Sequence, residues 1–168
     1  MKIYYREKSG GIENLRCFGI EGRVEIPGMI DDKLVISAAP YAFSSHMDEK
    51  EDLKNASLWE VSDGLEFGRE EHVLAGNDVE EIVFPYTLKE IGRYIFYGCG
   101  NLKKLEFSDS LMQIGCGAFT GCHALEKLTV HMEQGKKSGV KEMLGEMWQR
   151  IDVNFLYEYE DCLLYTSP

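Results

Sequence analysis

Cysteine and histidine are the residues of this 168-residue chain whose types and spacing come closest to a chemistry. Cys99 and Cys122 lie 23 positions apart and could form a disulfide or share a soft metal ion, with His123 as a further ligand. Cys116 would need a histidine from elsewhere in the chain as its base before it could act as a nucleophile. Because none of these spacings is that of a zinc site, we expect packing roles for the cysteines and surface positions for His46, His72 and His131. We therefore predict no catalytic residue, no metal site, no cofactor and no enzymatic activity.

The charge of the chain argues against polyanionic partners. There are 29 acidic and 18 basic residues, which gives a net charge of −11 and disfavours nucleic acids and anionic membrane surfaces. Residues 46–81 hold twelve of the acids and three of the bases, a net charge of −9. This segment is either a solvated surface that keeps the protein soluble or a docking site for a basic partner. Its candidate docking residues are Asp48, Glu49, Glu51 and Asp52.

An internal repeat organises the rest of the sequence. Residues 79–101 (VEEIVFPYTLKEIGRYIFYGCGN) align without a gap on residues 102–124 (LKKLEFSDSLMQIGCGAFTGCHA), with seven identities. A third copy starts at Leu125 and departs after His131, and a looser copy spans residues 24–43. In each unit a short run of alternating apolar residues, such as Ile82 and Phe84, predicts a strand. Glycines that recur at the same positions of the unit predict tight turns of the backbone. Units of this length cannot bury their apolar faces alone, so the repeat predicts a solenoid of stacked parallel strands.

These residues resemble the BspA-type leucine-rich repeat, a bacterial class whose unit reads approximately L-x-x-I-x-I-P-x-x-V-x-x-I-G-x-x-A-F-x-G-C. Residues 102–122 carry nearly the whole pattern. The looser copy at residues 24–43 is similar to a longer form of the unit, but it has Asp32 in place of a glycine and Ala38-Ala39 in place of Ile-Gly. The resemblance implies a protein-interaction scaffold, and some secreted members of the class bind host surface proteins.

The expected fold is an α/β leucine-rich-repeat solenoid of 23-residue coils with a cap at each end. Residues 1–23 form a β-hairpin cap, and residues 24–132 form the repeats. Within the repeats, residues 24–52 are a long first coil, 53–78 a degenerate acidic coil or an insertion, 79–101 and 102–124 regular coils, and 125–132 a partial one. Residues 133–168 form a cap with a helix from Ser138 to about Gln149 and a strand after Ile151. We expect the chain to stop short of the native carboxyl terminus, because Cys162–Pro168 resembles the middle of a returning strand.

The feature best suited to binding is the exposed face of the repeated strands. The register places outward-facing side chains of adjacent strands side by side. This candidate partner-binding strip, called the strip below, consists of Arg23, Glu25, Glu81, Val83, Lys104, Glu106, Lys127 and Thr129. Ordinary charge pairing on a solvated sheet is the alternative interpretation.

The sequence thus predicts a non-enzymatic protein–protein interaction scaffold that binds neither nucleic acid nor membrane. We expect a cytoplasmic protein, because the first eight residues become charged before any apolar stretch and no apolar run is long enough to span a membrane. The alternative is a piece of a longer cell-surface or adhesin-like structural protein whose export signal or anchor is missing. Discovery of an upstream signal or a downstream anchor in the full reading frame would favour that alternative.

Overall fold

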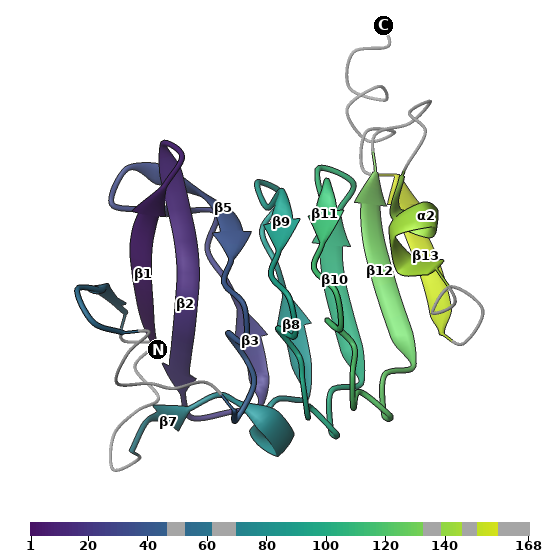
Figure 1. Cartoon of the computed structure of the whole chain (residues 1–168), viewed down its shortest axis with the longest axis horizontal. Coiled ribbons are helices and arrows are strands. Elements are labelled where there is room, and N and C mark those ends of the chain that lie inside the picture. The colour runs from purple at the N-terminus through teal and green to yellow at the C-terminus, as the bar shows by residue number, and fades with distance from the viewer. Residues whose placement is uncertain (47–52, 62–69, 133–138, 146–150, 158–168) are drawn as a thin grey trace, which may run out of the picture.

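The chain forms a β-solenoid of about five turns (Figure 1). The computed structural model describes residues 1–46, 53–61, 70–132, 139–145 and 151–157. Its strands stand side by side along the long axis, from the amino-terminal hairpin at one end to the last strand at the other. Among the described residues, no helix combines the length and the apolar character needed to cross a membrane.

One face of the solenoid is a parallel five-stranded sheet. Its members in spatial order are β13 (Asp152–Tyr157), β12 (Lys127–Met132), β10 (Lys104–Ser108), β8 (Glu81–Val83) and β3 (Arg23–Glu25). Between β8, β10 and β12 each residue pairs with the residue 23 positions along the chain, as Leu105 does with Ile82 and Leu128. The sequence repeat therefore sets the strand register directly, and the expected solenoid with 23-residue coils is confirmed.

The other face is an eight-stranded sheet that includes the amino-terminal hairpin. Its main path runs through β11 (Gln113–Ile114), β9 (Glu90–Ile91), β5 (Lys33–Ala38), β2 (Gly11–Gly19), β1 (Lys2–Lys8) and β6 (Ser57–Glu60). Two further strands pair at its side: β4 (Met29–Ile30) with β5, and β7 (His72–Val73) with β2. The hairpin strand β2 lies parallel to β5, so it covers the open end of the first coil.

The core lies between the two sheets and is built from the repeated apolar positions. Phe43, Phe84, Phe96 and Phe107 are each at most 1% exposed, and the ring of Phe96 lies 6.2 Å from both Phe43 and Phe84. Ile82, Leu105 and Leu128 form a buried row one residue away from the strip. Alternation along each short strand therefore sends one set of side chains inward and the strip outward.

Two repeated glycines let neighbouring coils approach closely. A side-chain carbon on Gly115 would lie 2.2 Å from the backbone nitrogen of Arg93, and one on Gly92 would lie 2.4 Å from that of Pro40. The position of Gly92 is taken in the first coil by Ala39, whose backbone nitrogen instead donates to Asn14 of the hairpin. The neighbour of Ala39 on this side is the hairpin strand β2 rather than another coil.

The longer first coil contains a small hairpin. Strands β4 and β5 are antiparallel, with Ile30 opposite Lys33. The two residues between them, Asp31 and Asp32, have φ angles of 53° and 62°. Positive φ at both central residues is the geometry of a tight hairpin turn, in which aspartate can replace glycine.

The described residues between Phe43 and Val79, called the excursion below, lie outside the stacked coils of the solenoid. Strand β3 pairs directly with β8, while β6 pairs with β1 and β7 pairs with β2 on the cap. The short 3-10 helix η1 (Gly76–Asp78) returns the chain to the first coil, and the backbone nitrogen of Gly76 donates to the carbonyl oxygen of Phe43 at 2.8 Å. The described part of this excursion therefore packs against the hairpin and places no strand between the first coil and the next.

Both ends of the solenoid are covered by the expected kinds of cap. The carboxyl-terminal cap contains helix α2 (Val140–Leu144), with Val140 and Leu144 buried, and strand β13, which pairs with β12. The described helix starts after Gly139, which makes no side-chain cap, and the expected cap residue Ser138 lies outside the described residues, as do Met147 and Gln149.

Candidate functional site

The strip lies on the exposed face of the five-stranded sheet as two straight rows. Strand pairing aligns Arg23, Glu81, Lys104 and Lys127 in one row, and Glu25, Val83, Glu106 and Thr129 in the other. The rows come from four adjacent parallel strands, so neighbouring side chains within a row are spaced by the strand separation of about 4.8 Å. Buried Ile82, Leu105 and Leu128 hold the backbone beneath the rows in place.

At the amino-terminal end of the strip the charges are paired. A guanidinium nitrogen of Arg23 lies 3.0 Å from a carboxylate oxygen of Glu25, and Nε of Arg23 lies 3.6 Å from Oε1 of Glu81. The hydrogen bond to Glu25 is the main cause that raises the pKa of Arg23 above its ordinary value. Because these side chains are largely exposed, the pairs contribute little to stability.

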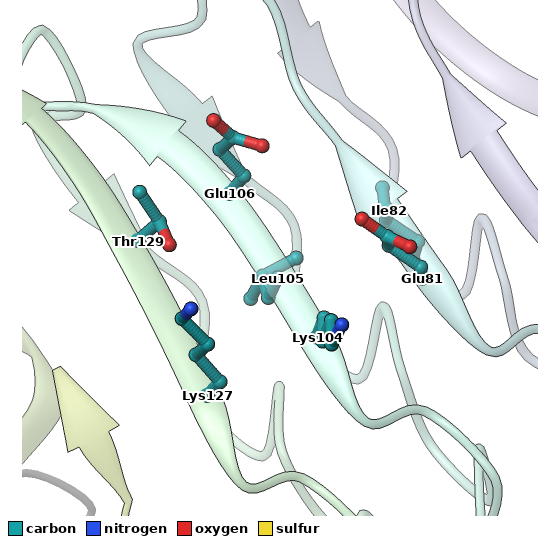
Figure 2. A pocket seen from close by; sticks show the side chains of 7 residues that line it. All are labelled: Glu81, Ile82, Lys104, Leu105, Glu106, Lys127 and Thr129. Atoms are coloured by element: carbon teal, nitrogen blue, oxygen red, sulfur yellow. The ribbon is translucent and has the colours of Figure 1, made fainter. Parts of the chain in front are cut away.

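At the carboxyl-terminal end of the strip two positive charges face each other. Lys104 and Lys127 are directly opposed on β10 and β12, and both are exposed. Within the described part of the chain, neither ammonium group lies in an ion pair. Like charges directly opposite on adjacent strands repel each other. These lysines line a depression of about 180 Å³ with Glu81, Glu106 and Thr129 around it and Ile82 and Leu105 beneath (Figure 2).

Beside this depression lies a polar cluster of Glu106, His131 and Tyr86. Nε2 of His131 contacts the Glu106 carboxylate, and Nδ1 lies 3.2 Å from the Tyr86 hydroxyl. The rings of Tyr86 and His131 lie 4.9 Å apart, and the Ser110 hydroxyl donates to the carbonyl oxygen of Tyr86 at 2.6 Å. His131 is 8% exposed, so the expected surface position for this histidine is wrong. It pairs with Ser108 on the strand-face that alternation makes outward, so the sequence pattern gave no signal of its burial.

The cysteines of the repeat take packing positions. The Cys122 thiol donates to the carbonyl oxygen of Phe96 at 3.2 Å, and the Cys99 thiol donates in the same way to Phe43. Desolvation raises the pKa of both thiols to about 12, and that of the buried Cys17 likewise. Thiols held neutral in this way are poor nucleophiles and poor metal ligands. Cys116 and His123 are exposed, and the described residues contain no cluster of three or more metal-binding side chains.

A buried arginine that the sequence reasoning missed closes the amino-terminal end of the solenoid. One guanidinium nitrogen of Arg16 donates to the carbonyl oxygens of Tyr41, Ala42 and Ser44 at 3.0, 3.2 and 2.6 Å. In the following coil, the carbonyl group of Ile95, which is equivalent to that of Ala42, accepts from the backbone nitrogen of Phe43 in the preceding coil. Arg16 therefore supplies to Ala42 the donor that a preceding coil would provide. Its position on the β-like run of residues 15–20 gave no signal of this role.

The acidic docking residues Asp48, Glu49, Glu51 and Asp52 lie outside the described residues. The described parts of the excursion include β6, whose Glu60 lies 3.7 Å from the Lys2 ammonium group, and Glu71, whose carboxylate lies 3.9 Å from the same group. These two acids face the hairpin rather than the strip.

Part of the repeat matches a known family model. Residues 70–140 match the family model described as BspA type leucine rich repeat region (6 copies). The search of curated proteins gave no match.

Two solved structures are similar to this chain. A leucine rich cell surface protein from Faecalibacterium prausnitzii A2-165 is 16% identical, with a TM-score of 0.50 over 91% of this chain. The chain spans 41% of the length of that protein, and the similarity establishes the shared fold alone. The leucine rich repeat protein of T. pallidum is 22% identical, with a TM-score of 0.37 over 93% of this chain and 80% of its own length.

Proposed function

We propose that this chain, whose residues 70–140 are a BspA-type leucine-rich repeat region, is a non-enzymatic scaffold that binds another protein through the strip. The observation that carries the proposal is a pair of directly opposed lysines, neither of which forms an ion pair among the described residues, on a face where Arg23 pairs with Glu25 and Glu81. A sheet that evolved only to be solvated would tend to place opposite charges on adjacent strands. Each lysine has an acidic strand neighbour on its other side, Glu81 for Lys104 and Asp152 for Lys127, but the two lysines face each other. This pairing favours a partner that supplies a negative charge between them.

The rigidity of the strip also supports a binding role. Its side chains project from parallel strands that are fixed by backbone hydrogen bonds and by buried residues beneath them. A surface that is already ordered loses little conformational entropy on binding. The neighbouring Glu106, His131 and Tyr86 hold one another in place through two side-chain contacts.

The state of the thiols supports a scaffold rather than an enzyme. Cys99 and Cys122 are buried and their pKa values lie near 12, so neither is poised for nucleophilic attack. Cys116, which is exposed, makes no described contact with a histidine that would act as its base.

Site-specific photo-crosslinking in cells of the native host tests this proposal. A photoreactive amino acid is placed at Thr129 in the strip and, as a matched control, at Lys89, which is exposed beside β9 of the other sheet. We expect a discrete protein adduct from position 129 that is absent from position 89. Equal labelling at both positions, or no adduct from position 129, would contradict the proposal.

A second candidate function is structural, as part of a longer cell-surface protein. It is favoured by the similarity to the F. prausnitzii cell surface protein over 91% of this chain, which spans only 41% of that protein. A cytoplasmic location and a surface location make opposite predictions in intact cells. Protease added to the cells should spare a cytoplasmic chain, as judged by immunoblot, and should degrade a surface-exposed one.

A further inference from the structure

We infer that the partner of the strip presents an acidic side chain, aspartate or glutamate, to Lys104 and Lys127 from an extended segment. This inference rests on the proposed function, because it specifies the chemistry of the partner at the same surface. The two ammonium groups would share the partner carboxylate, and the hydroxyl group of Thr129 lies in the same depression as a further donor.

The charges of Lys104 and Lys127 favour the binding of an anion between them. Lys104 and Lys127 stand opposite each other on adjacent strands, and a carboxylate between them would replace their repulsion with two attractions. Hydrogen bonds between an ammonium group and a carboxylate are roughly twice as strong as those between neutral groups. The proposed contact therefore corrects an unfavourable feature of the free protein and also adds binding energy.

The acidic residues nearest the lysines are engaged elsewhere. Glu81 lies 3.6 Å from Arg23, and Glu106 contacts His131. Asp152 is the strand neighbour of Lys127 on its other side, and no ion pair joins these two residues. Among the described residues no carboxylate forms an ion pair with either lysine, although Glu81 and Glu106 line the same depression.

The size of the depression indicates a side chain rather than a free small molecule. Its volume of about 180 Å³ lies below the range of roughly 300 to 1,000 Å³ that pockets for drug-sized ligands occupy. Buried Ile82 and Leu105 form its floor, so a ligand can rest on the sheet without penetrating it. A partner with an extended backbone could follow the sheet surface and insert one carboxylate between Lys104 and Lys127, whose side chains Figure 2 shows on adjacent strands.

The net charge of the whole chain does not oppose such a contact at short range. Nine of the eleven net negative charges fall in residues 46–81, and the remaining 132 residues together carry −2. Beyond about 8 Å, charges are largely screened at physiological ionic strength. At the point of contact the four charged side chains that line the depression, Lys104, Lys127, Glu81 and Glu106, therefore matter more than the net charge of the chain.

Selection from a library of displayed random peptides tests the inference. Selected peptides are read by sequencing and their affinities are measured by fluorescence anisotropy, against the native protein and against K104E/K127E. The matched control is K89E/K103E, which changes the net charge equally at two exposed lysines that make no described side-chain ion pair. Circular dichroism melts establish that each variant folds, and K104Q/K127Q removes the charges without reversing them.

We expect enrichment of aspartate or glutamate at one position, and binding about tenfold or more weaker in K104E/K127E with no comparable loss in the control. Peptides with lysine at the enriched position should regain affinity for K104E/K127E, which a merely structural role of the lysines would not produce. Peptides that bind the strip are identified by their loss of affinity for a Thr129→Trp variant. If these peptides show no enrichment of acidic residues, the inference is overturned and the proposed function stands. A library that yields no peptide sensitive to Thr129→Trp would overturn both.

Discussion

The ring of Phe96 lies 5.7 Å from the ring of Phe119, its equivalent in the next coil, yet only Phe96 is fully buried. Phe96 packs between Phe43 and Phe119, whereas Phe119 is only partly buried against the core. The repeat makes the two residues equivalent in sequence, and their positions in the stack make them unequal in burial.

Truncation of these two rings should therefore have different costs. We expect Phe96→Ala to lower the free energy of unfolding by about 3 to 5 kcal/mol, because the cavity would be enclosed on both sides. Phe119→Ala should cost roughly half as much, since part of its ring is already exposed to water. Urea denaturation followed by circular dichroism measures both, and equal losses would contradict the assigned burial.

Arg16 should be essential to the amino-terminal end of the solenoid. Replacement of Arg16 by Met leaves the carbonyl groups of Tyr41, Ala42 and Ser44 without its donated hydrogen bonds. The carbonyl group of Tyr41 still accepts from the backbone nitrogen of Ser44, so two acceptors lose their described donor. At about 1 to 3 kcal/mol for each, we expect a total loss of about 2 kcal/mol or more. Arg93→Met is the control, because Arg93 is exposed and its side chain makes no described ion pair. Denaturant melts that show similar losses for the two variants would refute this role.

Gly115 should tolerate no side chain, because it touches backbone rather than a movable side chain. A methyl group at this position would lie 2.2 Å from the nitrogen and 2.5 Å from the Cα atom of Arg93. We expect Gly115→Ala to destabilise the protein by about 3 kcal/mol or more, through separation of the two coils. Gly139→Ala is the matched control, since no atom lies within 4 Å of its added carbon. A thermal melt in which both variants match the native protein would show that the coils are less closely packed than described.

The buried thiols should make the protein sensitive to alkaline pH. Burial raises the pKa values of Cys17, Cys99 and Cys122 from the ordinary 9.0 to about 12. Between these values the unfolded chain loses thiol protons that the folded chain retains, so the free energy of unfolding falls as the pH rises from about 9 to about 12. Each thiol contributes up to about 1.4 kcal/mol per pH unit to this slope.

Denaturant melts across this pH range should therefore give a shallower slope for Cys99→Ala than for the native protein. Cys116→Ala, at an exposed position, should leave the slope unchanged. Iodoacetamide labelling of the folded protein at neutral pH, read by peptide mass spectrometry, should modify Cys116 well before the three buried cysteines. Rapid labelling of Cys99 in the folded state would contradict its burial.

The regular part of the fold was predictable because the repeat encodes its own register. An offset of 23 residues fixed which residues pair across β8, β10 and β12, and so which side chains of the strip share a row. Ala39 takes the position of Gly92 in the first coil, where its neighbour is the hairpin strand β2 rather than another coil.

Contacts between residues distant in the sequence were not predictable in the same way. The pairing of β6 and β7 with the hairpin depends on which surface the excursion meets, and short strands of this kind carry little pattern of their own. The burial of His131 and its contacts with Glu106 and Tyr86 join three different coils, and nothing in the residue types alone distinguishes it from a surface histidine.

The sequence by itself determined the solenoid, its register and the composition of the strip, because each of these follows from a local pattern repeated at a constant interval. Only the tertiary structure decided which members of the strip are neutralised, leaving Lys104 and Lys127 unpaired while Arg23 pairs with its neighbours. It also placed Arg16 as the substitute for a missing coil. The physical reason is that charge pairing and end capping depend on distances between side chains from different coils, and these distances exist only once the coils are stacked.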